Sequence, residues 1–184
     1  MQNINKQTDR LTSLINDLLN TSKIQAGKLL LEKKAFNLSE LVAKTVVDFQ
    51  YVTETHQIIK EGEMKEQVFG DQSRIEQVLA NLITNAVKYS PKADKVIVRV
   101  RTDKKNAIVS VQDFGFGIEK RDQAKVFERF YRTNDKEEMS VAGFGLGLYI
   151  SAEIIKGHHG KIWVESAKGK GSTFYFTLPL KKEV

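Results

Sequence analysis

The chain contains no cysteine and only two prolines among its 184 residues. Without cysteine it can build neither a disulfide framework nor a thiolate metal site. No apolar run approaches the roughly 20 residues that a membrane-spanning helix needs, and the first stretch is polar and amphipathic, unlike a signal peptide. We therefore expect a soluble, cytoplasmic domain, whose parent protein could still be anchored in a membrane.

The composition is 41% hydrophobic and 28% charged, with a net charge of +6. This mixture is too apolar for a disordered chain. An excess of positive charge favours polyanionic partners such as nucleic acid, acidic lipid or nucleotide phosphates. The basic residues are scattered among 23 acidic ones, so an ordinary solvated surface is the alternative explanation.

Residues 1–27 have the pattern of a long amphipathic helix. Leucine and isoleucine recur at three- and four-residue spacing from Ile4 to Ile24, with charged residues between them. Such a helix would be about 40 Å long and too narrow to bury its own apolar stripe, so it needs a partner helix. The alternative is that it packs on its own domain.

The remaining pattern alternates helices and strands, with hairpins dominating the second half. Residues 28–35 are predicted as a charged connector. Hairpins favour an antiparallel or mixed sheet with helices on one face, which is a two-layer α/β sandwich. The predicted helices are 38–52, 73–89 and 146–156, with a short one near 123–128, and the predicted strands are 57–60, 67–69, 96–102, 108–112, 161–166 and 172–180.

Three clusters of residues indicate chemistry. On the helix from Ser73, the polar residues Arg74, Gln77, Asn81, Asn85 and Lys88 fall on one face. Asparagine is a mediocre helix former, but its carbonyl oxygen suits Mg²⁺, and a lysine suits phosphate. A plain exposed polar face is the alternative.

The other two clusters are rich in glycine. Asp113 ends a predicted strand and opens the run Asp113–Gly117, where a carboxylate can accept a hydrogen bond from an exocyclic amine such as that of adenine. Glycines there allow close approach of the backbone, although an ordinary glycine turn is the alternative. Residues 143–148 read GFGLGL before a helix, where free N–H groups suit phosphate. A flexible hinge is the alternative, and neither a dinucleotide fingerprint nor a P-loop is present.

Taken in order, these segments resemble the ATP-binding catalytic domain of sensor histidine kinases, in the GHKL ATPase superfamily. Residues 77–90 (QVLANLITNAVKYS) resemble the asparagine box, and DFGFG resembles the first glycine box. VFERFYR at 126–132 resembles the phenylalanine box, and GFGLGL the second glycine box. The N-terminal helix resembles the second helix of the dimerisation and phosphotransfer hairpin.

The resemblance implies roles for individual residues and three parts of the chain. The parts are a hairpin helix at 1–27, a linker at 28–36 and an ATP-binding domain of the Bergerat type at 37–184. Residues 118–142 would be a lid over the nucleotide. The implied catalytic residues are Asn81, Lys88 and Arg132, the implied Mg²⁺ ligand is Asn85, and the implied nucleotide-binding residues are Asn81, Asn85, Lys88, Tyr89, Asp113, Gly115, Gly117, Ile118, Tyr131, Arg132, Gly143, Gly145, Leu146, Gly147, Leu148 and Thr173.

Position 81 helps to distinguish the reactions of this superfamily. Members that hydrolyse ATP carry a glutamate base at the matching place, whereas Asn81 cannot take a proton at neutral pH. The resemblance thus implies transfer of the γ-phosphate to a histidine, with a response regulator as partner and dimerisation through the N-terminal helix.

The acceptor motif of these kinases is not present, and the three histidines, His56, His158 and His159, do not match it. We therefore expect a fragment that binds ATP and Mg²⁺ but does not phosphorylate itself. The alternatives are an anti-sigma-type serine kinase and a non-catalytic ATP-binding switch. A nucleic-acid binder is disfavoured, because no basic patch interleaved with aromatics is present.

Overall fold

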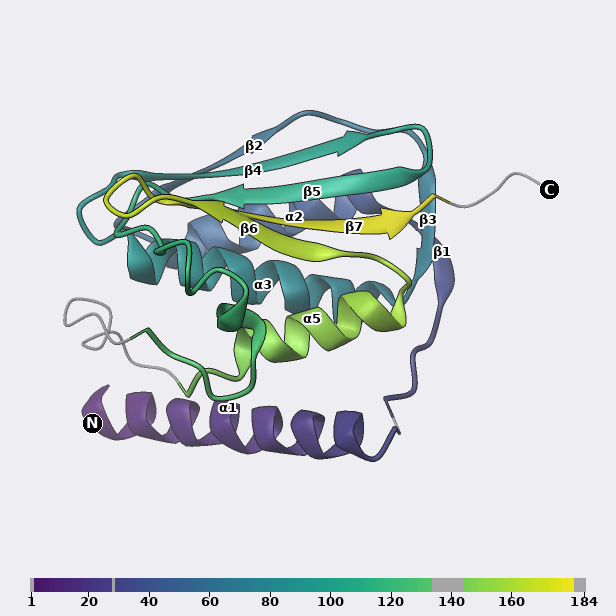
Figure 1. Ribbon diagram of the computed structural model, residues 1–184. Helices are drawn as coiled ribbons and strands as arrows, with labels where there is room; N and C mark the ends of the chain where they lie inside the picture. Colours follow the sequence, from purple (N-terminus) through teal and green to yellow (C-terminus); the bar gives the residue numbers. More distant parts are fainter. Residues whose placement is uncertain (1, 28, 134–143, 181–184) are drawn as a thin grey trace.

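The computed structural model describes residues 2–27, 29–133 and 144–180 (Figure 1). Five strands form the main sheet in the order β2-β4-β5-β7-β6. Only the β2–β4 pair is parallel, and the other three pairs are antiparallel. These strands are β2 (Gln57–Glu61), β4 (Lys95–Thr102), β5 (Asn106–Gln112), β6 (Ile162–Ser166) and β7 (Ser172–Pro179).

Three helices cover one face of this sheet: α2 (Leu38–Val52), α3 (Gln72–Tyr89) and α5 (Gly147–Gly157) (Figure 1). Burial alternates along β7, where Phe174, Phe176 and Leu178 are buried. Alternation of this kind places one face of a strand against the helices. The predicted two-layer α/β sandwich, with a mixed and mostly antiparallel sheet, is confirmed.

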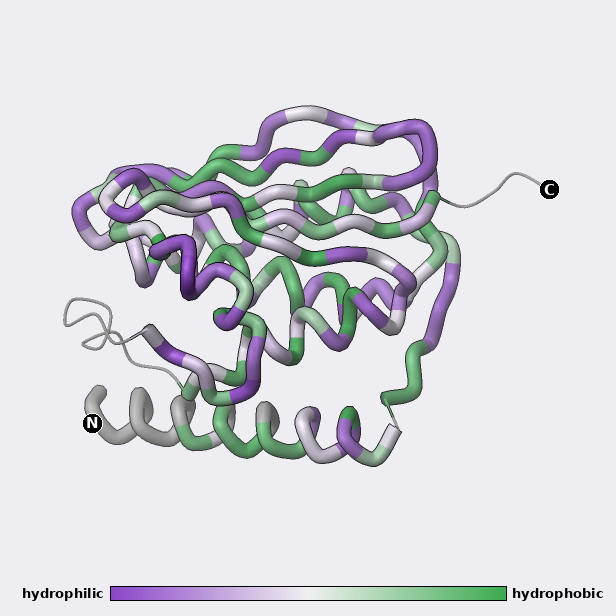
Figure 2. Tube along the Cα trace, in the orientation of Figure 1, coloured by the Kyte–Doolittle hydropathy of each residue, from purple (hydrophilic) through white to green (hydrophobic). Residues whose placement is uncertain are grey.

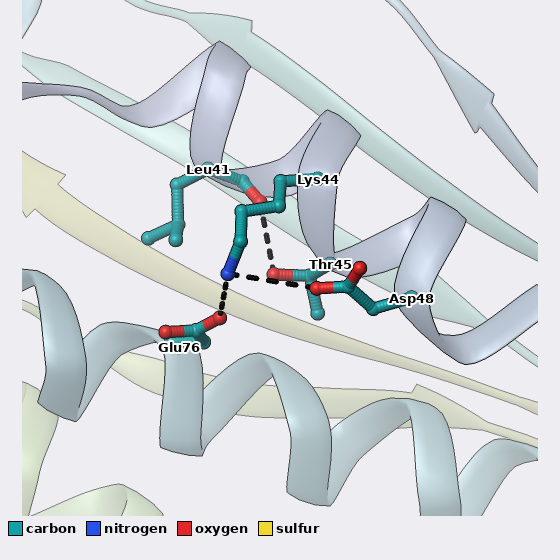
Figure 3. Close-up of polar contacts among 5 residues, drawn as sticks. All are labelled: Leu41, Lys44, Thr45, Asp48 and Glu76. Carbon is teal, nitrogen blue, oxygen red and sulfur yellow. Dashed lines mark hydrogen bonds and ion pairs between the residues drawn. The ribbon is translucent and has the colours of Figure 1, made fainter.

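Side chains fix the starts of the two longer covering helices. Asn37 Oδ1 accepts from the N–H of Glu40 to cap α2, and Asp71 Oδ1 accepts from the N–H of Arg74 to cap α3. Each acceptor satisfies one of the backbone donors that a helix start leaves open. Between the helices, Lys44 on α2 lies between Asp48 and Glu76, and so links α2 to α3 at the surface (Figure 3).

A second, two-stranded sheet was not expected from the sequence. Strand β1 (Lys34–Asn37) pairs antiparallel with β3 (Gln67–Gly70). Residues 28–35 were predicted as a connector, and its end proves to be a strand. Only Phe36 of this strand is buried, so four residues give too short an alternation to be distinguished from a charged linker.

The N-terminal helix α1 (Gln2–Gln25) runs alongside α5. Its end is attached to the domain: Asn20 Oδ1 accepts from Arg74 at 3.3 Å, Thr21 is buried and Ile24 packs against the core. Leu11, Ile15, Leu18 and Leu19 are 45–58% exposed, and Figure 2 shows the middle of this helix as hydrophobic. The helix therefore packs on its own domain at one end and keeps an open apolar stripe.

Within the described part of the chain, no helix combines the length and the apolar character needed to cross a bilayer. The short helix predicted near residues 123–128 is a single 3₁₀ turn, η1 (Lys125–Phe127). It packs near α5, and its Phe127 ring meets Phe174 of β7 edge-on at 6.3 Å between centroids. This contact attaches the segment after the first glycine run to the sheet.

Candidate functional site

The middle of α3 meets the start of α5 at two asparagines. A Cβ on Gly147, the first residue of α5, would overlap Asn81 Oδ1, so the absence of a side chain at 147 lets the Asn81 amide lie against the start of the helix. Asn81 Nδ2 donates to Ser151 Oγ at 3.0 Å. One turn further along α3, Asn85 Nδ2 donates to Asn81 Oδ1 at 3.5 Å. The two asparagines therefore lie side by side next to the N-terminus of α5.

The backbone N–H groups at the start of α5 have no side-chain cap, because Leu146 occupies the N-cap position. Leu146 is buried and Leu148 packs against the core, so these two leucines fix the helix start by packing. Gly145, with φ of 68°, accepts from the N–H of Phe130 at 2.9 Å. The start of this helix is thus held by packing, and no side chain caps its N–H groups within the described residues, an arrangement that suits an anion.

The first glycine run packs against two other segments. A Cβ on Gly115 would overlap the carbonyl of Tyr89 at the end of α3, and the N–H of Phe116 donates to that carbonyl at 3.1 Å. Gly117 has φ of 67°, and a Cβ there would overlap the carbonyl of Ala167 in the β6–β7 turn. The loop therefore needs both glycines to lie between α3 and this turn.

Asp113 is 3% exposed at the end of β5. Its Oδ1 accepts from the N–H of Gly115 at 2.9 Å and from that of Ser172 at 3.2 Å. Burial raises the pKa of Asp113 to about 6, while the two N–H bonds act in the opposite direction. Oδ2 makes no hydrogen bond within the described ranges, so it is left as an acceptor for a ligand.

The segment after the glycine run is bonded to the end of β6 and also within itself. Ile118 N–H donates to Ser166 Oγ at 2.7 Å, and Gln123 Nε2 donates to the carbonyls of Ile118 and Ser166 at 3.1 and 2.7 Å. Tyr131 Oη donates to Asp122 Oδ1 at 2.7 Å, and this bond raises the pKa of Tyr131. These contacts fix residues 118–131 at the base of the predicted lid, 118–142, of which the structure describes 118–133.

The predicted site residues fall into groups that α3 connects. Asn81 and Asn85 lie beside Gly147, and Tyr89, one turn beyond Asn85, contacts the loop that follows Asp113. Lys88 is exposed near the end of α3, and Tyr131 and Arg132 follow η1. Thr173 pairs in register with Gln112, next to Asp113. Gly143 lies outside the described residues.

Three residues of this region were missed by sequence analysis: Ser151, Gln123 and Ser166. Ser151 follows an apolar run and resembles a core position, and the other two are single polar residues in ordinary loop or strand-end sequence. A hydroxyl one helical turn after a glycine run was the available signal for Ser151. For Gln123 and Ser166 the sequence carries none, because their contacts span 43–48 residues.

The described residues hold no group of three or more histidine, cysteine, aspartate or glutamate side chains placed to bind a metal ion. The two asparagines offer amide oxygens instead. Mg²⁺ is commonly held by one or two protein oxygens together with water and substrate phosphates. Asn85, close to open helix N–H groups, therefore fits a magnesium ion that arrives with a phosphorylated ligand.

A two-layer sandwich with an acidic strand end, an asparagine-bearing helix and a glycine-led helix start defines a nucleotide-binding domain of the ATPase type. Residues 70–182 match the family of histidine kinase-, DNA gyrase B-, and HSP90-like ATPases. The chain belongs to this family, as the resemblance of its four segments implied.

Within this family, the chain is similar to sensor histidine kinases. The chain is 35% identical over 183 residues to the sensor histidine kinase WalK of Bacillus subtilis (strain 168), covering 96% of this chain and 30% of that protein. Among solved structures, the catalytic domain of histidine kinase ThkA is 32% identical with a TM-score of 0.67, covering 80% of this chain and 97% of that one. Acinetobacter baumannii histidine kinase AdeS is 26% identical with a TM-score of 0.78, covering 98% of this chain and 84% of that one.

Proposed function

We propose that the chain binds Mg·ATP and donates the γ-phosphate to a histidine on a phosphotransfer helix in two-component signalling. The observation that carries this proposal is the arrangement along α3. The middle of its polar face meets the start of α5 at Asn81, and the C-terminal end of the helix meets the loop of Asp113 at Tyr89. The chain spans less than a third of the WalK relative. The activity and partners of a complete kinase are therefore part of this proposal.

The adenine base would lie at Asp113. Its Oδ2 would accept the exocyclic amine, while Oδ1 is already held by two N–H groups. Gly115 and Gly117 shape the loop beside it, Ile118 continues that loop, and Thr173 lies on the neighbouring strand. Because the carboxylate is held from behind, it meets the base without rearranging, which lowers the cost of binding.

The phosphates would lie at the start of α5. Asn85 would ligate Mg²⁺, and the ion when bound neutralises phosphate charge and aligns the chain for transfer. Gly145 and Gly147 shape the helix start, with Gly143 before them and Leu146 and Leu148 packed behind. Lys88, Tyr89, Tyr131 and Arg132 would contact the phosphates and the sugar.

Asn81 favours phosphoryl transfer over hydrolysis. Its amide cannot take a proton from water at neutral pH, and it is already bonded to Ser151. In the proposed reaction the bond from the γ-phosphorus to the bridging oxygen breaks, a bond to an imidazole nitrogen forms, and ADP leaves. Positioning and charge neutralisation carry such a step.

The acceptor would be a histidine outside this sequence, because the histidines of the chain are engaged or remote. His56 and His158 are buried, and both ring nitrogens of each are within hydrogen-bond distance of a partner. His159 is exposed with φ of 59° at the far end of α5 from Asn81. We propose that residues 1–27 form the second helix of the hairpin that carries the acceptor and dimerises, that 28–36 link it to the ATP-binding domain at 37–184, and that a response regulator receives the phosphate.

Calorimetric titration with Mg·ATP tests the binding step. Asp113→Asn and Asn85→Ala should each weaken binding strongly, whereas Asp48→Asn, on the exposed face of α2 (Figure 3), should leave it unchanged. Unchanged affinity in both site variants would remove the assignment.

Transfer is tested by adding a hairpin helix with an acceptor histidine and labelled ATP. Acid-labile phosphate on that helix supports the proposal. Acid-stable phosphate on a partner would indicate the anti-sigma-type serine kinase instead, and binding without any transfer would indicate a nucleotide-dependent switch.

A further inference from the structure

Ser151 lies behind the asparagine pair and touches neither the nucleotide nor the cation in the function proposed above. It is 2% exposed, one turn into α5. Its Oγ donates to the carbonyl of Gly147 at 2.9 Å and accepts from Asn81 Nδ2 at 3.0 Å. The hydroxyl therefore joins the glycine that begins α5 to the asparagine that it faces.

The direction of these hydrogen bonds follows from the number of protons available. A serine hydroxyl has one proton, and that of Ser151 is given to Gly147. Toward Asn81 the hydroxyl can then only accept, so Asn81 must present its NH₂ group to Ser151 and its oxygen to the other side. Asn85 Nδ2 donates to that oxygen, so Asn85 Oδ1, which accepts no hydrogen bond from the described residues, ends the chain of bonds.

This end matters because the two atoms of an amide differ in what they bind. Mg²⁺ takes oxygen ligands, and an NH₂ group turned toward the cation would repel it. We propose that Ser151 is a positioning residue that fixes the amide orientation of Asn81, and through it that of Asn85, so that an oxygen faces the divalent cation. This inference rests on the proposed binding of Mg·nucleotide and deepens it.

The hydrogen bonds set this orientation, and the packing keeps the amide close to α5. Because Gly147 has no Cβ, the Asn81 side chain lies directly against the start of α5. The ordinary explanation for Ser151 would be local, since serine and threonine often bond the carbonyl four residues before them in a helix. Thr45 does this on α2: its buried hydroxyl donates to the carbonyl of Leu41 at 2.9 Å (Figure 3). Among the described residues, no asparagine or glutamine side chain donates to the Thr45 hydroxyl.

Thr45 therefore supplies a matched control. Ser151→Ala and Thr45→Val each remove a buried hydroxyl that bonds a carbonyl one turn back, but only the first removes the acceptor for Asn81. The experiment measures the affinity for ADP by calorimetry, once with Mg²⁺ and once with EDTA. The ratio of the two dissociation constants reports the contribution of the cation.

In the unaltered protein Mg²⁺ should tighten ADP binding. Ser151→Ala should reduce this tightening about fivefold while changing the affinity in EDTA less than twofold, and Thr45→Val should change neither. Ser151→Thr and Ser151→Val form a second pair of equal size that differs in the hydroxyl. Of these, the threonine should retain the Mg²⁺ effect and the valine should lose it.

Two results would overturn the inference: an unchanged Mg²⁺ effect in Ser151→Ala and Ser151→Val, or an equal loss of affinity with and without the cation. The second would indicate that Ser151 only supports the helix. If the unaltered protein binds no ADP, or binds it equally in Mg²⁺ and EDTA, the proposed function itself is wrong. The titration of the unaltered protein therefore separates a failure of the proposed function from a failure of this inference.

Discussion

Asp71 and Asp113 are both buried, at 6% and 3% exposure, yet their environments differ in kind. The Asp71 carboxylate accepts from Ser73 Oγ and from the N–H groups of Arg74 and Glu32. Burial alone would raise the pKa of Asp71, but these bonds outweigh burial and lower it. Asp113 accepts only two N–H bonds, both on one oxygen, and burial raises its pKa to about 6.

The difference separates a structural carboxylate from a binding one. Both oxygens of Asp71 are used by its own chain, so it caps α3 and holds the connector before β1. One oxygen of Asp113 has no hydrogen-bond partner in the part of the chain that the structure describes, at a cost in stability that a bound donor can offset. A carboxylate with a raised pKa and open acceptor capacity is a candidate functional group.

The largest expected effect is on ligand binding at Asp113. Asp113→Asn should weaken ATP about 100-fold, or roughly 2.7 kcal/mol, because the adenine amine loses a charged acceptor. The asparagine oxygen can still accept from Gly115 and Ser172, so the folded domain should persist. Calorimetry with Mg·ATP measures the loss, and circular dichroism verifies the fold. An unchanged affinity for ATP in Asp113→Asn would contradict the assignment of Asp113 as the binding carboxylate of the two.

The next effect is on stability at Asp71. Asp71→Ala should lower the free energy of unfolding by about 2 kcal/mol, because it removes a helix cap and leaves the N–H of Glu32 without its acceptor. The affinity of the folded fraction for ATP should stay within about twofold. Urea denaturation followed by circular dichroism measures the first quantity and titration the second. Asp71→Asn, which keeps one acceptor oxygen, serves as the control and should lose less.

The sequence alone identified Asp113 as a candidate binding residue. It did not predict how the environments of Asp71 and Asp113 differ. Each directly follows a strand, and the local sequence does not indicate how many hydrogen bonds each carboxylate accepts. What distinguishes them is the N–H of Glu32, 39 residues away in the chain. A contact of that kind is set by the docking of the connector, which local periodicity does not encode.

The same reasoning explains what else was and was not predictable. The longer elements, such as α3, follow from hydrophobic periodicity and caps, and their positions agree with prediction to within a few residues. Strand β1 was missed because four residues with one buried side chain carry no period. Ser151 was missed because its role depends on how closely two helices approach at Gly147, a tertiary distance.

A third prediction concerns pH and the free protein. The native pKa of Asp113, about 6, lies above the ordinary value of 3.8 for an aspartate, so the native state binds the proton more tightly than the unfolded chain does. Stability from this group is therefore highest at low pH and falls as the pH rises through 6. Between pH 5 and 7 the loss should be about 1 kcal/mol and absent in Asp113→Asn. Urea midpoints of the two proteins at pH 5, 6 and 7 measure it, and parallel profiles would show that Asp113 is not strained.

The smallest effect is expected at His158, which connects to Asp71 through the backbone. Its Nε2 accepts from the N–H of Asp71 at 2.8 Å and its Nδ1 donates to Ile154, so the ring is neutral, and burial lowers its pKa. Stability from His158 is therefore complete above pH 6.5 and is lost as the pH falls below that value, which is opposite in sign to the effect of Asp113. His158→Gln places an amide oxygen near the position of Nε2 and cannot be protonated there.

The variant should thus reduce the loss of stability between pH 6.5 and 5 by less than about 1 kcal/mol, measured by urea denaturation in an Asp113→Asn background that removes the opposing titration. The affinity for ATP should not change, because this ring lies at the end of α5 remote from Asn81. If stability falls equally between pH 6.5 and 5 with and without His158→Gln, protonation of His158 does not contribute to the loss. The acid sensitivity near Asp71 would then come from the Asp71 carboxylate alone. A change in ATP affinity would show that the C-terminal end of α5, at His158, is coupled to its N-terminal end, at Asn81.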